Sequence, residues 1–136
     1  MTRAAKGTFQ VTMNPEPPYD VSDGVSLGRI AIAKEFSGDL VGTSSVQMIA
    51  ARGEVKTSAG YVALERVLGV LDGRKGSFVL QHFGVMTRGK PELTVLVVPD
   101  TGTADLVGIA GRMTIEIVEG KHFYSFEYHF DAPPTP

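Results

Sequence analysis

Three side chains near the middle of the chain are of types that can transfer protons: Tyr61, Glu65 and His82. Glu65 stands in a run of apolar residues, and burial of a carboxylate raises its pKa. An imidazole beside such a carboxylate can share its proton. The sequence therefore indicates Glu65 as a candidate catalytic acid or base, with His82 and Tyr61 orienting it.

The dipeptide Asp72-Gly73 determines how these residues are placed. It is typical of a two-residue type I′ turn between antiparallel strands. In the register that this turn imposes, Tyr61, Glu65 and His82 point to one face of the hairpin, and Glu65 and His82 are diagonal neighbours.

Both faces of this hairpin are apolar enough to be buried. The opposite face carries Val62, Leu64, Leu68 and Phe83. The sequence does not determine which face points inward, and an apolar outer face would need a partner surface. The polar residues have two alternative interpretations: a hydrogen-bonded network that maintains strand register, or a solvent-exposed face.

A second turn, Glu119-Gly120, sets the register of the last hairpin. It pairs Arg112 with Glu127 on the outer face, and the opposite face is then the interior. The candidate ligand contacts lie on that inner face: Met113, His122, Tyr124, Phe126 and Tyr128. Tyrosines in a barrel can orient a ligand through their hydroxyls, or they can simply fill the interior.

Segments with the composition of β-strands run through the whole chain. We expect strands at 7–13, 27–37, 40–51, 60–71, 75–86, 92–99, 105–118 and 121–130. Prolines predict a loop over 14–23, and 131–136 is expected to be a flexible tail. Sustained helical periodicity is absent, so we predict one all-β domain over 1–136.

Eight long strands favour an eight-stranded antiparallel closed β-barrel, because closure removes exposed sheet edges. A two-sheet sandwich is the alternative architecture. Lys34 shares a face with Ile32 and Phe36. Its ammonium group is either an anion anchor at a barrel mouth or a charge that reaches past apolar neighbours to water.

Composition excludes several function classes. The chain has 136 residues, a net charge of -2 and no cysteine, so thiolate chemistry and disulfides are excluded. No clustered basic face suggests nucleic acid as a partner. No apolar segment approaches the roughly 20 residues that span a bilayer, and no signal-like segment opens the sequence, so we expect a cytoplasmic protein without a membrane partner. No metal site or cofactor is predicted, since His122 and His129 point to opposite faces of one strand.

Several segments, in order along the chain, resemble a bacterial family of unknown function, domain of unknown function 3224. They are Phe36-Ser37-Gly38-Asp39-Leu40, Ala59-Gly60-Tyr61-Val62-Ala63-Leu64-Glu65-Arg66, Gly76-Ser77-Phe78-Val79-Leu80-Gln81-His82-Phe83-Gly84 and 98–108, followed by Gly111-Arg112-Met113. The resemblance covers about Ala5 to Phe130. It implies an eight-stranded antiparallel barrel similar to that of allene oxide cyclase, and it implies no activity.

We therefore expect a barrel that binds a small, largely apolar molecule in its interior. Any catalysis is expected to be acid–base chemistry without a cofactor, as in an isomerase, a cyclase or a lyase. The alternative is a non-catalytic, solidly packed barrel whose second apolar face mediates self-association into a homo-oligomer.

Overall fold

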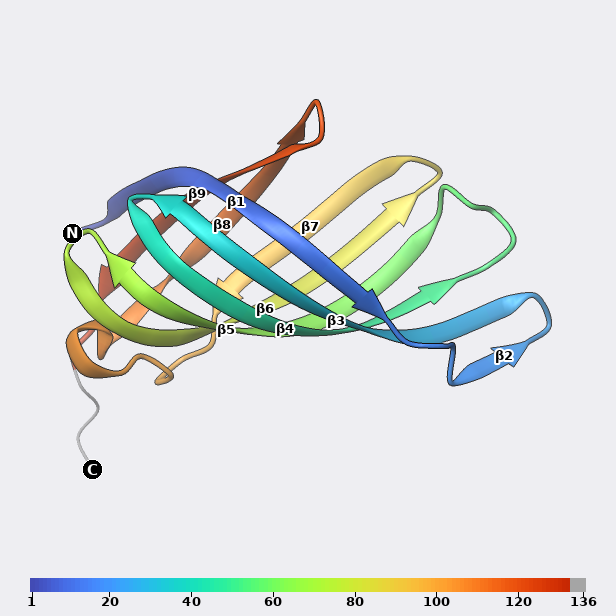
Figure 1. Cartoon of the computed structure of the whole chain (residues 1–136), viewed down its shortest axis with the longest axis horizontal. Helices are drawn as coiled ribbons and strands as arrows, with labels where there is room; N and C mark the ends of the chain where they lie inside the picture. Colours follow the sequence, from blue (N-terminus) through green and yellow to red (C-terminus); the bar gives the residue numbers. More distant parts are fainter. Residues whose placement is uncertain (133–136) are drawn as a thin grey trace.

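Eight long antiparallel strands close into a barrel in the computed structural model, which describes residues 1–132. The strands are β1 (Arg3–Pro15), β3 (Val25–Gly38), β4 (Leu40–Arg52), β5 (Ala59–Leu71), β6 (Arg74–Thr87), β7 (Lys90–Val97), β8 (Ile109–Val118) and β9 (Lys121–Phe130). Closure occurs because β1 pairs with both β9 and β3 (Figure 1). The predicted all-β closed barrel is confirmed, and the sandwich alternative is wrong.

Both hairpin registers predicted from the turns are confirmed. Asp72 and Gly73 have positive φ angles of 48° and 86°, as a type I′ turn requires, and Glu65 pairs with Leu80. The Glu119-Gly120 turn likewise pairs Arg112 with Glu127. Each side chain of these hairpins therefore has a definite face.

The predicted loop over 14–23 is wrong in part. β1 continues through Pro15, and a short strand, β2 (Asp20–Ser22), pairs with the start of β3. The turn between β2 and β3 is Asp23-Gly24, with φ angles of 53° and 77°. This is the same turn chemistry as at Asp72-Gly73, so a short hairpin forms despite the nearby prolines.

The predicted strand over 105–118 begins later than expected. A short 3-10 helix, η1 (Ala104–Leu106), precedes β8, and Val107, which a strand over 105–118 would place on the same face as Met113, is 54% exposed. The hydroxyls of Thr101 and Thr103 accept hydrogen bonds from backbone N–H groups of β6, at 3.0 Å each. These bonds hold the segment against β6, and β8 starts only after it. Of the expected tail at 131–136, residues 133–136 lie outside the described residues.

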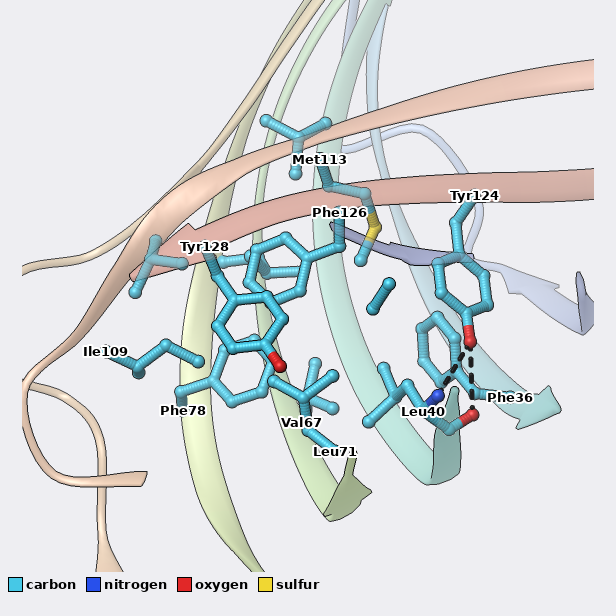
Figure 2. Close-up of a cluster of buried hydrophobic side chains, with 14 of the residues drawn as sticks. Phe36, Leu40, Val67, Leu71, Phe78, Ile109, Met113, Tyr124, Phe126 and Tyr128 are labelled. Carbon is cyan, nitrogen blue, oxygen red and sulfur yellow. Dashed lines mark hydrogen bonds between the residues drawn. The ribbon is translucent and has the colours of Figure 1, made fainter. Parts of the chain in front are cut away.

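One half of the barrel, which we call the closed half, is filled by stacked aromatic side chains (Figure 2). The rings of Phe78 and Phe126 stack with centroids 5.6 Å apart, and those of Phe126 and Tyr128 stack at 5.3 Å. Tyr124 accepts a hydrogen bond from the backbone N–H of Leu40 at 2.9 Å. The interior of this half is therefore a packed core.

The other half, the open end, is less tightly enclosed. Inward-facing residues there become accessible: Leu93 is 40% exposed and Ile117 is 65% exposed, while Val95 and Met113 on the same strands are buried. β7 and β8 pair at only two positions, Val95 with Met113 and Leu96 with Arg112. Beyond these pairs the β6–β7 and β8–β9 hairpins diverge (Figure 1), so solvent reaches the inner wall. Within residues 1–132, no helix is both long and apolar enough to cross a membrane.

Candidate functional site

A buried ionic network lies at the boundary between the closed half and the open end. Glu65 is fully buried and points into the barrel, as do His82, Lys34 and Ser44. One carboxylate oxygen of Glu65 is 2.6 Å from His82 Nε2 and 3.1 Å from Lys34 Nζ. The other oxygen accepts a hydrogen bond from Ser44 Oγ at 2.5 Å. The inner face of β5 and β6 is thus the one that carries Glu65 and His82.

Strand pairing explains why these four side chains meet. Lys34 on β3 is directly opposite Ser44 on β4. Ser44 in turn is opposite Val67 on β5, which places it diagonal to Glu65. His82 on β6 is diagonal to Glu65 from the other side, because it pairs with Ala63. Four neighbouring strands therefore each direct a polar side chain to one point.

The pKa of Glu65 is lowered, not raised as the sequence suggested. Burial alone raises the pKa of this carboxyl group. The hydrogen bond from His82, the charge of Lys34 and the hydrogen bond from Ser44 act in the opposite direction and prevail. Glu65 is therefore ionised near neutral pH, and it is poorly suited to give up or take a proton itself.

An ionised Glu65 determines how the His82 ring carries its protons. The carboxylate can only accept hydrogen bonds, so His82 Nε2 carries a hydrogen and donates it. In neutral His82, Nδ1 is then a lone-pair acceptor. Nδ1 has no hydrogen-bond partner among residues 1–132, and no fully buried side-chain nitrogen or oxygen in that part of the chain lacks a partner. His82 Nδ1 thus keeps contact with solvent.

Lys34 completes the charge balance of the network. Its ammonium group lies 4.6 Å from the centre of the Phe9 ring, in addition to its ion pair with Glu65. The group is buried, so neither interpretation from the sequence, a free anion anchor or a charge that reaches water, describes it. The attraction between the buried Lys34 and Glu65 charges offsets part of the cost of removing both from water.

Tyr61 shares the inner face with Glu65 and His82 but is not bonded to them. Its ring lies over Gly84, where a Cβ atom would approach the ring to 2.3 Å. Glycine is therefore required at position 84 for Tyr61 to lie flat on the inner wall. Burial raises the pKa of the Tyr61 hydroxyl. Of the predicted triad, Glu65 and His82 are thus hydrogen-bonded to each other, while Tyr61 lies further toward the open end.

The candidate ligand contacts on β8 and β9 are mostly part of the packed core. Met113, Tyr124, Phe126 and Tyr128 are buried in the closed half. The Tyr124 hydroxyl donates to Ser37 O at 3.0 Å, and the Tyr128 hydroxyl bonds to an Asp72 carboxylate oxygen. Figure 2 shows the bonds between the Tyr124 hydroxyl and the backbone of Leu40. Both hydroxyls bond to the protein itself.

His122 is the exception among these five residues. It is half-buried toward the open end, where its ring lies 5.1 Å from that of Phe9.

Sequence reasoning missed Ser44 and the role of Lys34. A two-residue turn at Gly38-Asp39 would have paired Lys34 with Thr43, whereas the β3–β4 hairpin is centred on Asp39 and pairs Lys34 with Ser44. In the described part of the chain, no three His, Asp or Glu side chains come together to hold a metal ion.

Comparison with known proteins identifies relatives whose function is unknown. The family model described as "Protein of unknown function (DUF3224)" matches residues 5–128. A crystal structure of a protein of unknown function from the DUF3224 family of Shewanella oneidensis MR-1 is 46% identical. It superposes with a TM-score of 0.91, over 97% of this chain and 100% of that one. No curated protein matches the chain significantly. The chain belongs to the DUF3224 family.

Proposed function

We propose that the barrel binds a small, largely apolar molecule at its open end, with His82 Nδ1 as the polar group that recognises it. The observation that carries this proposal is a buried carboxylate that fixes an imidazole while leaving its second nitrogen without a protein partner. Apolar inner-wall side chains that stay partly exposed, such as Ile115 and Leu93, would surround the ligand.

The geometry also supports proton transfer on such a ligand. Glu65 orients the His82 ring, which is the role a carboxylate plays beside a catalytic histidine. His82 Nδ1 would accept a proton from an acidic C–H or O–H group, leave the bonding electron pair on the ligand, and return the proton to another ligand atom. This exchanges the roles expected from the sequence: His82 is the acid and base, and Glu65 positions it. Isomerisation, cyclisation and elimination all fit this chemistry.

Two probes of the same shape test the binding proposal. 2-Naphthol is apolar and carries one O–H donor, and 2-methoxynaphthalene lacks that donor. We expect 2-naphthol to bind about fivefold tighter in fluorescence titrations, because one hydrogen bond contributes roughly 1 kcal/mol. His82→Phe should abolish the difference. Equal affinity of the wild-type protein for both probes would overturn the proposed role of Nδ1.

A matched pair of variants locates the site. Ile115 points inward at the open end, while the adjacent Thr114 points outward. Ile115→Trp should fill the open end and prevent binding of 2-naphthol, and Thr114→Trp should not. If both variants bind the probe like the wild-type protein, the ligand does not enter the open end. Native mass spectrometry of freshly purified protein would additionally show any ligand retained from the cell.

A further inference from the structure

The outer surface of β4–β7 forms an exposed apolar wall. Its core consists of six side chains that are each 41–59% exposed: Ile49, Val62, Leu64, Leu68, Phe83 and Leu96. These residues alternate along their strands with the inward-facing residues, so the wall is the back of the same sheet that carries the ionic network. We call this surface the outer wall.

Strand register makes the outer wall continuous. Ile49, Val62 and Phe83 are direct cross-strand partners and form one ridge. Leu64 and Leu96 flank Gln81 in the neighbouring ridge. Between the two ridges runs a groove of about 580 Å³, whose lining includes residues of both. Ridges and grooves of this kind interdigitate when two sheets pack face to face.

Charge is nearly absent from the middle of this wall. The strands β4, β5 and β6 contain one acidic residue, Glu65, and it points into the barrel. On the outer face of β5, Arg66 lies between Leu64 and Leu68, and Arg29 lies at the β3 end of the groove, so between β4 and β7 the two ridges themselves carry no charge. Depletion of charge at the centre, with arginine and polar groups around it, is typical of the core of a subunit interface.

The extent of the wall fits a subunit interface. It crosses four strands, or about 15 Å at the usual spacing, and on β5 it runs from Val62 to Leu68, or about 20 Å. A soluble monomer rarely leaves a continuous apolar patch of more than about 300–600 Å² exposed. A standard interface covers about 800 Å² per partner, including a polar rim, so the wall would form the apolar centre of such an interface.

We propose that a second copy of this chain packs on the outer wall, face to face around a two-fold axis. An isologous contact uses the same patch on both copies, so one apolar wall satisfies both. Phe83, the most exposed of the six side chains, would insert into the groove of the other copy as an aromatic anchor. This inference is independent of the proposed ligand site, which lies on the other face of the sheet.

Sedimentation equilibrium of the full chain tests this directly. We expect the mass of two copies for the wild-type protein over about 1–100 μM. Leu64→Glu and Phe83→Ser should each raise the dissociation constant by at least about 30-fold, the loss expected at an interface hot spot. Thr114→Glu places a charge on the outer face of β8, away from the wall, and should leave the dimer intact.

Circular dichroism of each variant establishes that it is folded, and the polar Phe83→Ser variant gives a second measurement if Leu64→Glu does not fold. A wild-type protein that is monomeric at about 100 μM would overturn the proposal. So would folded Phe83→Ser protein that associates as tightly as the wild type. A single copy whose bound apolar molecule in native mass spectrometry is lost in Phe83→Ser but kept in Ile115→Trp would show that a ligand, rather than a second copy, covers the wall.

Discussion

The closed half and the open end of the barrel fill their interiors in opposite ways. Stacked aromatic rings occupy the closed half, and the tyrosine hydroxyls there bond to the protein's own backbone and carboxylate groups. The open end instead begins with an ion pair and an imidazole, beyond which apolar side chains remain partly exposed. The first arrangement holds the strands together, while the second leaves hydrogen-bonding capacity for another molecule.

Buried polar groups have different roles in the two halves of this barrel. Tyr124 and Glu65 are both buried polar residues with protein partners. The partners of Tyr124 are backbone groups of a turn, so its hydroxyl locks that turn in place. The partners of Glu65 include His82, which has a second nitrogen, so the network ends in a group that can still act.

The largest expected effect is a loss of stability when the packing of the closed half is disrupted. Phe126→Ala should lower the free energy of unfolding by about 3–5 kcal/mol, because it removes a fully buried ring between Phe78 and Tyr128 and leaves a cavity. Ile117→Ala at the open end should change it by less than about 0.5 kcal/mol, because that side chain is mostly exposed. Urea unfolding measures both. Similar losses for the two variants would show that the two halves do not differ in packing.

The next effect concerns the ionic network. Glu65→Gln keeps the size of the side chain but leaves the buried Lys34 without a counter-charge, and we expect a loss of about 2–3 kcal/mol. Lys34→Met in the Glu65→Gln background should recover much of it, since no buried charge remains at that position. A double-mutant cycle by urea unfolding gives the coupling energy. Additive losses would mean that Lys34 and Glu65 do not stabilise each other.

A smaller effect distinguishes Tyr124 from Tyr61, two tyrosines on the inner face of the barrel. Tyr124→Phe should cost about 1–2 kcal/mol, because it leaves the N–H of Leu40 without its acceptor. Tyr61→Phe should leave unfolding nearly unchanged, since its hydroxyl has no hydrogen-bond partner among residues 1–132. If Tyr61 contacts a ligand, its variant should instead weaken binding of 2-naphthol. The opposite pattern of stability losses would contradict the assignment of Tyr124 to the core.

The fold was predictable because local turn chemistry determines the register of each hairpin. Asp72-Gly73 and Glu119-Gly120 were sufficient to pair the strands of two hairpins correctly, and apolar alternation indicated the remaining strands. Asp23-Gly24 carried the same information, but the prolines before it favoured a loop. Where hydrogen bonds to side chains replace a turn motif, as at Thr101 and Thr103, no local sequence pattern predicts the structure.

The candidate site was predictable only within one hairpin. Glu65 and His82 follow from a single turn, so their proximity could be derived. Ser44 and Lys34 reach them from two other strands, and their contribution depends on barrel closure and on several registers together. The direction of the Glu65 pKa was wrong for the same reason: the expectation included burial and omitted the groups that oppose it.

The smallest expected effect is a change in how the free energy of unfolding depends on pH. Because the pKa of Glu65 is lower in the folded protein than its ordinary value of 4.5, the unfolded chain binds a proton more readily. The stabilisation is complete above pH 4.5 and is lost as the pH falls through the folded pKa. Glu65→Gln should remove this contribution, so its free energy of unfolding should fall less steeply with decreasing pH than that of the wild type. The slopes of the free energy of unfolding against pH can differ between the two proteins by at most one bound proton, or about 1.4 kcal/mol per pH unit.

Ser44→Ala provides the intermediate case in this measurement. It removes one hydrogen bond that lowers the pKa of Glu65 while keeping the carboxylate. The pH range over which Glu65 causes the free energy of unfolding to fall with acid should therefore be narrower than in the wild type, but still present. Urea unfolding between about pH 3 and pH 6 compares the three proteins. Parallel curves for the wild type and Glu65→Gln would mean that Glu65 has the same proton affinity in both states. The network of Lys34, His82 and Ser44 would then not favour the ionised form of Glu65 over the unfolded chain, and the difference between the open end and the closed half would be one of packing alone.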